Sequence, residues 1–487
     1  MNKNKIGVFI PVHGNYRYLM HLLGTLKSDK FDIVVGIINN GSDKDTNDYC
    51  NSLIGKENYI VENYEEALGV SGAWNRCLDL AIELDLDKII ISNSDVLYHP
   101  ECIDTLAKFL DDNPDEIVAM PIDLREVKSV YEKIHVFSPA YLHHFRYSKE
   151  ALDGIYNILS NAIKINVKEP EVRHDLLVGW YSFMIKPKEL LSEVGYFDDN
   201  FFPAYWEDTD MSWRISLCGK NQGVVVNACV LHINNRSLLE GGLSFNCIEK
   251  NSVYFTEKHS PTLLPGQRVV VDGKTVRVWE FKEGCASKNA IEKKGVKKTI
   301  YDCFSISTKK DIQNLELRFK ILNQIVDYFI IVEPDKDENG KNRDILFLQY
   351  QDDFQDYIDK VKIIRAKGKL SSNLPDHLNK IISSSSDEDL FIVSNVCDIP
   401  DPRKLNEFKY MENLNIYFEI CDFQNNYEIG PRFCSKSNVA NDETNTITAK
   451  KAGWKLLNLK SLPMRQIEKM ENTYRSKLYL DGLLKKT

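Results

Sequence analysis

Short apolar runs alternate with helical patterns over the N-terminal part of the chain. Runs rich in Val and Ile, each ended by Pro, Gly or Asn, predict strands at residues 6–12, 33–38, 59–61 and 88–92. Residues 102–112 place their apolar side chains at positions i, i+3, i+4 and i+7, which share one face of a helix. This alternation predicts a largely parallel α/β sheet, in which ligands bind at the carboxyl ends of the strands.

The C-terminal half repeats this alternation after a stretch in which the periodic pattern weakens. Residues 249–298 carry several Pro and Gly and a lysine-rich run, so they predict a linker with a small hairpin near residues 268–278. The later elements that the pattern predicts are an amphipathic helix at 310–326 and strands at 328–332, 360–364 and 390–394. We therefore expect two tandem α/β domains with mainly parallel central sheets.

Length and charge limit the domain number and the partners. A chain of 487 residues suits two or three domains. The predicted boundaries are 1–248 for the first domain, 249–298 for the linker and 299–487 for the second domain. Lys and Arg number 62 against 71 Asp and Glu, and this net charge of −9 makes nucleic acid an unexpected partner.

Cysteine usage and hydropathy bear on the compartment. The 11 cysteines include no C-x-x-C pair, a pattern that fits neither a disulfide scaffold nor a zinc ribbon and favours a reducing compartment. No apolar run approaches the length of a membrane-spanning helix, and the first strand follows the N-terminus too closely for a signal peptide. We expect a cytoplasmic protein, with association at a membrane surface and formation of a homodimer left open.

The loops after the predicted strands collect glycine and polar residues. Those at the ends of the first two strands are Pro11, Val12, His13, Asn39, Asn40, Gly41 and Ser42. Gly69, Gly72 and Asn75 then lie in a glycine-broken entry to a helix, where backbone amides could bind a phosphate. The alternative is that these glycines only serve the turn.

An acidic loop and a late histidine suggest a cation site. Asn93, Ser94 and Asp95 directly follow a buried strand, and a carboxylate there can reach a divalent cation held by a diphosphate. His232 ends a later strand predicted at residues 224–231, and imidazole is a common metal ligand. The alternatives are a turn or cap aspartate and a structural histidine.

Three acidic residues lie close together in an aromatic segment. Glu207, Asp208 and Asp210 stand where burial and mutual repulsion raise carboxylate pKa values toward those of a general base. The same carboxylates also suit the first turn of the following helix, because a helix N-terminus favours negative charge. Both roles can hold at once, since a base at a helix start is well oriented.

The order of these signals resembles the family 2 glycosyltransferases, which have the GT-A fold, and most closely their rhamnosyltransferase-like branch. The resemblance covers about the first 245 residues. The matching segments are 8–12, 39–42, 68–75, 93–95, 195–202, 207–210 and His232. The family's D-x-D position keeps only its last acid, Asp95, and Asn39 stands where the family usually has an aspartate against the nucleobase N3–H.

The resemblance implies an inverting hexosyl or deoxyhexosyl transfer from a UDP-, dTDP- or GDP-sugar to a hydroxyl of a glycan or glycoconjugate. Asp208 is the expected general base, with Glu207 and Asp210 as the other catalytic candidates, and Asp95 and His232 are the expected ligands of Mn²⁺ or Mg²⁺. The expected donor-binding residues are Pro11, Val12, His13, Asn39, Gly41, Ser42, Gly69, Gly72, Asn75, Asn93 and Ser94. Aromatic faces suited to the acceptor sugar belong to Trp180, Tyr205 and Trp206, each of which also suits a core position.

The second half, from about residue 299 to 460, resembles the family 17 glycosyltransferases of the β-1,4-N-acetylglucosaminyltransferase type. The family's acidic motif appears at residues 394–400, where Asn395 and Cys397 replace expected metal ligands and Asp398 remains. Lys455 stands where the family has histidine. We therefore expect the second domain to lack metal-dependent transferase activity.

Two other functions stay open at this level. Both halves could be non-catalytic sugar-binding modules that act as a scaffold, given Asn39, Asn93 and the altered motif of the second half. A transferase could also act on modified nucleic acid, although the acidic charge balance argues against this acceptor. The complete acidic cluster at residues 207–210, together with His232, favours the enzyme.

Overall fold

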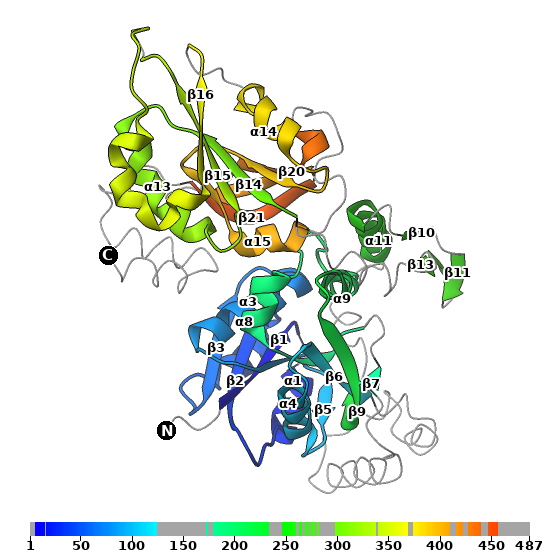
Figure 1. The fold of residues 1–487 in the computed structure, drawn as a ribbon. Helices are drawn as coiled ribbons and strands as arrows, with labels where there is room; N and C mark the ends of the chain where they lie inside the picture. The colour runs from blue at the N-terminus through cyan, green and yellow to red at the C-terminus, as the bar shows by residue number, and fades with distance from the viewer. Residues whose placement is uncertain are drawn as a thin grey trace, which may run out of the picture. The chain divides into compact units, whose positions relative to one another are not determined.

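The computed structural model divides into two compact units, each with its own sheet (Figure 1). The first unit comprises residues 1–257 and 262–291, and the second comprises 258–261 and 292–487. The residues that the structure describes are 5–14, 16–123, 172–173, 179–232, 246–259, 263–264, 268–271, 274–277, 280–281, 298–337, 339–368, 374–409, 415–421, 427–439 and 447–455. Among them, no helix combines the length and the apolarity needed to cross a membrane.

The first unit begins with four parallel strands in the spatial order β3-β2-β1-β4. They are β1 (Lys5–Val12), β2 (Asp32–Asn40), β3 (Tyr59–Tyr64) and β4 (Ile89–Ser92). The helices of this part are α1 (Tyr16–Thr25), α2 (Lys44–Asn51), α3 (Gly69–Glu83) and α4 (Cys102–Asp112). All four predicted strands and the predicted helix at residues 102–112 are confirmed.

The sheet continues in the order β8-β6-β9-β5, where antiparallel pairs join the parallel ones. The strands are β5 (Val96–Tyr98), β6 (Glu116–Asp123), β7 (Val172–Arg173), β8 (Ser182–Ile185) and β9 (Asn221–His232). The helices are α8 (Pro187–Glu193), α9 (Glu207–Leu217) and α11 (Asn246–His259). Of these strands the sequence analysis predicted β9 and did not predict β5, β6, β7 or β8. Strands β5, β7 and β8 have two to four residues, too few for a clear periodic pattern.

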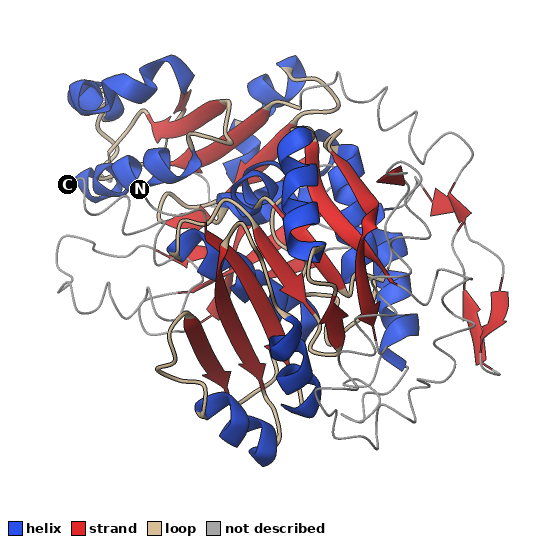
Figure 2. Ribbon diagram, turned by 90° about the horizontal axis from the view of Figure 1, so that it is seen from below, coloured by secondary structure: helices blue, strands red, loops and turns tan. Residues whose placement is uncertain are grey.

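Burial on both faces explains the continuous apolar runs of the central strands. Val8, Phe9 and Ile10 are adjacent in β1 and all are fully buried, which is the pattern of a parallel sheet covered on both sides. Helix α3 packs on β1 and β2, and α4 packs on β6 and β9. Figure 2 shows helices, in blue, lying against the strands, in red. Gly36 makes room for the Phe9 ring, because a Cβ atom there would lie 2.5 Å from it.

The segment predicted as a linker contains regular structure. The predicted hairpin is confirmed, since β11 (Arg268–Val271) pairs antiparallel with β12 (Lys274–Arg277). A second antiparallel pair joins β10 (Leu263–Leu264) to β13 (Glu280–Phe281). Helix α11 occupies residues 246–259, so regular structure extends across the predicted start of the linker at residue 249.

The second unit contains an eight-stranded sheet in the order β16-β15-β14-β17-β20-β19-β21-β18. Its strands are β14 (Ile300–Ser305), β15 (Tyr328–Pro334), β16 (Val361–Ala366), β17 (Leu390–Val393), β18 (Asp398–Pro400), β19 (Asn415–Cys421), β20 (Tyr427–Ser435) and β21 (Ile447–Lys455). Its helices are α13 (Lys309–Leu322), α14 (Asn379–Ser384) and α15 (Pro402–Phe408), with 3₁₀ helices η4 (Phe347–Lys360), η5 (Leu374–His377) and η6 (Lys436–Asn438). Strands β14 to β17 are mutually parallel, as predicted.

A buried ion pair holds the core of the second unit together. Arg318 of α13 donates from Nε to Asp302 Oδ2 of β14 at 2.8 Å, and both side chains are fully buried. Burial raises the pKa of Asp302, and the Arg318 charge opposes that rise. Arg318 also donates to the carbonyls of Asn395, Val396 and Asp398, so it fixes the loop between β17 and β18.

Both units combine helices with a sheet that contains parallel strands, so the predicted α/β class is confirmed.

Candidate active site

The loops that follow β1 and β2 are joined by hydrogen bonds at the carboxyl edge of the sheet. His13 Nδ1 donates to the Asn40 carbonyl at 2.8 Å, and Ser42 Oγ donates to the Val12 carbonyl at 3.1 Å. The Gly14 amide in turn donates to Ser42 Oγ at 3.1 Å. The residues predicted at the first two strand ends therefore form one connected edge, and Pro11 lies beside them, opposite Ile38 in the strand register.

Two glycines in this edge are required by close backbone approach. Gly41 has φ of 65°, and a Cβ atom there would lie 2.7 Å from the Ala67 amide nitrogen. Gly69 has φ of 73°, and its Cβ atom would lie 2.8 Å from the Phe202 ring. Both conformations belong to the region that favours glycine. The Val70 amide donates to the Pro203 carbonyl at 2.8 Å, so the chain itself uses part of the α3 N-terminus.

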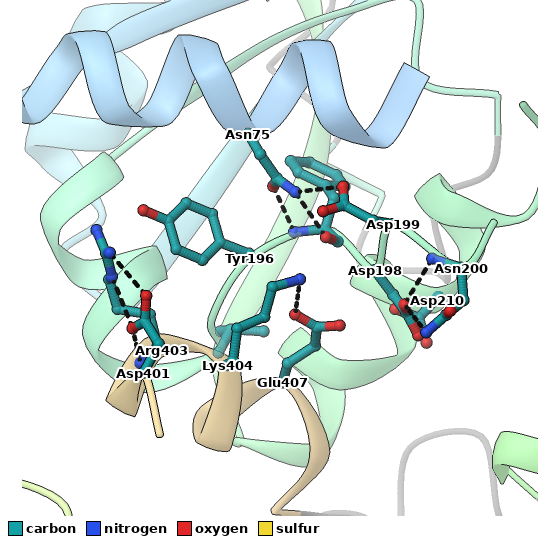
Figure 3. Close-up of polar contacts among 12 residues, drawn as sticks. Asn75, Tyr196, Asp198, Asp199, Asn200, Asp210, Asp401, Arg403, Lys404 and Glu407 are labelled. Carbon is teal, nitrogen blue, oxygen red and sulfur yellow. Dashed lines mark hydrogen bonds and ion pairs between the residues drawn. The ribbon is translucent and has the colours of Figure 1, made fainter. Parts of the chain in front are cut away.

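Asn75 connects α3 to the segment that precedes the acidic cluster (Figure 3). Its Nδ2 donates to the Phe197 carbonyl at 2.8 Å and to Asp199 Oδ1 at 3.0 Å. Its Oδ1 accepts from the Phe197 amide at 2.8 Å, and the side chain is fully buried. Asn75 therefore positions the segment at 197–199, and Gly72 is buried one turn before it in α3.

Asp95 and His232 are brought together by the pairing of two strands. Val96 of β5 lies opposite His232 of β9 in the register, and Asp95 directly precedes β5. His232 Nε2 lies 3.3 Å from Asp95 Oδ1, and both residues are buried. Neither oxygen of Asp95, nor His232 Nε2, has a hydrogen-bond partner among the described residues. The two predicted metal ligands thus form a buried pair with unused coordinating atoms.

The surroundings of this pair fix its orientation. The Tyr181 ring stacks on the His232 ring with centroids 4.7 Å apart, and the Tyr181 carbonyl accepts from the Asn93 amide at 2.7 Å. Ser94, between Asn93 and Asp95, is buried. Among the described residues no group of three or more His, Cys, Asp or Glu side chains could hold a metal ion. A cation here would need further oxygen ligands from water or substrate.

The acidic cluster begins α9 directly after a strained turn. Tyr205 and Trp206 have φ of 75° and 76°, which is uncommon for residues with a side chain. Asn251 of α11 donates from Nδ2 to the carbonyls of Ala204 and Tyr205 at 2.9 and 3.2 Å. The Phe255 ring packs against Trp206 with centroids 5.1 Å apart. Helix α11 therefore holds the turn from which Asp208 projects.

A second set of α11 contacts reaches the start of the same segment. Tyr254 donates from its hydroxyl to Asp198 Oδ2 at 2.6 Å, and its ring packs against Phe201. Asp198 Oδ1 accepts from Asn200, from its amide and its Nδ2, both at 2.9 Å (Figure 3). Sequence reasoning missed these functions of α11. The signal was available, because Asn251, Tyr254 and Phe255 have the i, i+3, i+4 spacing of one helix face.

The three acids of the cluster have three different environments. Asp210 is fully buried and accepts from Arg214 Nε at 2.8 Å, and Arg214 also donates to the carbonyls of Val194 and Tyr196. Glu207 is 5% exposed, and its Oε2 has no hydrogen-bond partner among the described residues. Asp208 is half-buried, which makes it the most accessible of the three.

Backbone amides hold the Asp208 carboxylate. Oδ2 accepts from the amides of Gly179 and Trp180 at 2.6 and 3.1 Å, and Oδ1 accepts from the Thr209 amide at 2.6 Å. The Trp180 ring packs in the core against Phe183, so it presents no open face to a sugar. Of the three aromatic residues expected to face an acceptor, Tyr205 and Trp206 are half-buried beside the cluster.

Comparison with known proteins identifies the class of the first unit. Residues 7–163 match the family model described as "Glycosyl transferase family 2". The first unit therefore contains a glycosyltransferase domain of this family, as the motifs predicted. The family 17 resemblance of the second half stays a prediction.

The similar proteins carry names that refer to different sugars. A galactofuranosyl glycosyltransferase of Leishmania donovani is 25% identical over 282 residues, which cover 51% of this chain and 61% of the relative. The chain thus spans about three fifths of the length of this curated relative. The mannosyltransferase PcManGT from Pyrobaculum calidifontis, solved with GDP-Man and Mn²⁺, is 13% identical, with a TM-score of 0.33 and coverage of 48% and 57%. GalNAc-T7 with UDP, GalNAc and Mn²⁺ is 14% identical, with a TM-score of 0.38 and coverage of 53% and 49%.

The Glu207 carboxyl should make stability depend on pH. Burial, and then the charge of Asp208, raises the pKa of Glu207 well above its ordinary value. The folded state therefore binds more protons than the unfolded state above about pH 4.3, and stability falls as pH rises through this window. Glu207→Gln removes this titration, so the variant should gain stability relative to wild type by up to about 1.4 kcal/mol per pH unit.

Thermal unfolding between pH 4 and pH 9 measures this difference. The exposed Glu66 gives the matched control, because Glu66→Gln should leave the pH dependence of the melting temperature as in wild type. Parallel curves for wild type and Glu207→Gln would show that Glu207 does not titrate in this way.

Proposed function

We propose that this chain transfers a sugar from a nucleotide-sugar donor to a hydroxyl of a glycan or glycoconjugate, by a metal-dependent inverting reaction. The observation that carries the proposal is the buried pair Asp95 and His232, whose coordinating atoms have no hydrogen-bond partner among the described residues. It lies in the unit that matches the family 2 model. Buried polar atoms are costly without a partner, so a bound cation accounts for them.

The residues present fit a divalent cation. Asp95 would supply a carboxylate oxygen and His232 its Nε2, which are donors that Mn²⁺ accepts. The remaining positions would fall to diphosphate oxygens and water, since the described residues form no group of three or more His, Cys, Asp or Glu ligands. The cation would supply charge neutralisation for the departing diphosphate.

Asp208 is the general base in this proposal. Asp210 is fully buried and ion-paired with Arg214, so it positions the helix rather than meeting an acceptor. Glu207 is buried as well, which leaves Asp208 as the acid that an acceptor hydroxyl can approach. The Gly179 and Trp180 amides orient the Asp208 carboxylate by donating to its Oδ2.

The chemical step balances with these groups. The acceptor oxygen attacks the anomeric carbon from the face opposite the diphosphate, and the bond from that carbon to the diphosphate oxygen breaks. The bonding electrons leave with the diphosphate, and Asp208 takes the proton of the attacking hydroxyl. One displacement inverts the anomeric configuration. The strand-end edge at His13 and Ser42 would hold the nucleoside, together with Asn39, which Asn47 links to Ser42.

The choice of donor starts from the curated relative. Because that relative is a galactofuranosyl transferase, a nucleotide-activated galactofuranose belongs in the first donor panel beside UDP-, dTDP- and GDP-hexoses. The half-buried Tyr205 and Trp206, next to the base, are the aromatic groups best placed to contact an acceptor sugar.

We further propose that the second unit is not catalytic. Asp398 Oδ2 accepts from Asn395 Nδ2 at 2.7 Å, and Asp398 Oδ1 accepts from Cys397 Sγ at 3.4 Å. Both oxygens are thereby engaged by neighbours in the loop that Arg318 fixes. A carboxylate used in this way is a poor ligand for a hydrated divalent cation.

Asp208→Asn should reduce sugar transfer by about 100-fold or more, because an amide cannot take the acceptor proton. Donor binding measured by calorimetry should change little. The amide nitrogen would face backbone N–H groups, so the melting temperature of the variant is measured beside its turnover. Wild-type turnover in this variant would contradict the assignment of Asp208 as the general base.

Donor binding should require a divalent cation. Calorimetric titration with UDP and GDP, in Mn²⁺ and then in chelator, should show affinity falling by about tenfold or more when the cation is removed. Asp95→Asn and His232→Gln should lower the affinity in Mn²⁺ to the level seen in chelator. His377→Gln, in the second unit, is the control and should bind as wild type. Equal affinity with and without chelator would contradict the cation site.

Asp398→Asn in the full chain should leave transferase turnover unchanged. The substitution keeps the shape of the side chain and removes the one acid of this loop's motif. Turnover is compared with wild type under saturating donor and acceptor. A folded Asp398→Asn variant with strongly reduced turnover would assign catalysis to the second unit.

A further inference from the structure

A chain of side-chain amides lies at the end of β2. Asn39 is fully buried, and its Nδ2 donates to Asn47 Oδ1 at 2.6 Å and to Asn63 Oδ1 at 2.7 Å. Both amide hydrogens of Asn39 are therefore used. Its Oδ1 is buried and has no hydrogen-bond partner among the described residues. The side chain thus offers an acceptor, and an acceptor only, to anything that contacts it.

The orientation of Asn39 depends on Asn47. Asn47 Nδ2 donates to the Ser42 backbone carbonyl at 3.1 Å, and a carbonyl can only accept. Asn47 must therefore turn its nitrogen to Ser42 and its oxygen to Asn39. This fixes which end of the Asn39 amide is the donor and which end is left as the acceptor.

Asn63 cannot fix the orientation in the same way. Its Nδ2 donates to Asn51 Oδ1 at 3.0 Å, and the side chains of both residues are exposed. A side-chain amide can present either end, so if Asn39 turned over, Asn63 and Asn51 could turn over with it and keep the hydrogen bonds among the three. The Ser42 carbonyl, acting through Asn47, is the part of the network with a fixed direction.

We propose that Asn47 decides which nucleobases the donor site accepts, by holding the Asn39 amide so that only its oxygen is available to the base. The inference rests on the proposed function, in which Asn39 belongs to the donor site. Bases with a ring N–H, namely uracil, thymine and guanine, would donate to Asn39 Oδ1. Cytosine would set the lone pair of its N3 against that oxygen and be rejected.

The same network accounts for asparagine in place of the family's aspartate at position 39. A carboxylate there would place an oxygen where Asn39 Nδ2 now meets two amide oxygens, at 2.6 and 2.7 Å. Asn63 could reverse to donate, but Asn47 could do so only by leaving the Ser42 carbonyl. With Asn47 present, the neutral amide is the better acceptor for the base.

Calorimetry on the full chain with UDP, GDP and CDP in Mn²⁺ tests the proposal. Wild type should bind UDP at least about tenfold more tightly than CDP, because the two nucleotides share their size and phosphates but differ at N3 and at the neighbouring C4 substituent. Asn47→Leu keeps the size of the side chain and removes the fixed acceptor, so the UDP to CDP affinity ratio should fall toward one. If Asn47 had a purely structural role, Asn47→Leu would lower the affinity for UDP and for CDP alike and leave their ratio unchanged.

Two matched variants should keep the wild-type ratio. Asn47→Asp retains an acceptor for Asn39 Nδ2, since a carboxylate can only accept, although it loses the hydrogen bond to the Ser42 carbonyl, so its stability is expected to fall while the affinity ratio is kept. Asn63→Leu leaves the Asn47 contact in place. Asn39→Asp should weaken UDP binding about tenfold or more, although a carboxylate by itself is the stronger acceptor. Melting temperatures establish that each variant is folded.

The outcomes separate this inference from the proposed function. If wild type binds none of the three nucleotides, the proposed function fails and the inference fails with it. If UDP binds but CDP binds equally well, or a folded Asn47→Leu keeps the ratio, the inference alone is overturned. If Asn47→Leu does not fold, tighter UDP binding by Asn39→Asp would still overturn it.

Discussion

The antiparallel pairing of β5 with β9 is the contact on which the candidate active site depends. It places Asp95, from the N-terminal half of the unit, beside His232, which lies near the end of the unit's sheet. The strands are fixed by buried apolar neighbours such as Leu97 and Val230, so the two ligands are held by packing and by register together. A shift of the register by one residue would turn His232 to the other face of the sheet.

The segment before α9 is held by polar side chains that bind its backbone. Asn75 binds at Phe197, Arg214 binds at Tyr196, and Asn251 binds at Ala204 and Tyr205. These contacts come from three different helices, and those of Asn251 lie at the strained turn of residues 205–206. Strain of this kind persists only when its surroundings enforce it, and it concentrates where a side chain must project in one direction. In the proposed function that side chain is Asp208.

The sequence predicted most of what depends on local pattern and little of what depends on distant pairing. Strands β1 to β4 and helix α4 follow from apolar runs and helical spacing, and the motifs located Asp95, His232 and the acidic cluster. The short strand β5 has three residues, too few for a periodic signal, although it brings Asp95 to His232. The different environments of Glu207 and Asp210 depend on tertiary burial and on Arg214, which spacing alone does not show.

The two units show why retained acids are a weak guide to function until their hydrogen bonds are counted. Asp95 and Asp398 each keep one acid of a motif, and both are buried. Asp398 has both oxygens engaged by Asn395 and Cys397, whereas those of Asp95 have no hydrogen-bond partner among the described residues. Because a buried carboxylate oxygen without a hydrogen bond costs free energy, this difference supports the proposed cation at Asp95. That difference favours a ligand at the first unit's pair and a structural role for the second unit's loop.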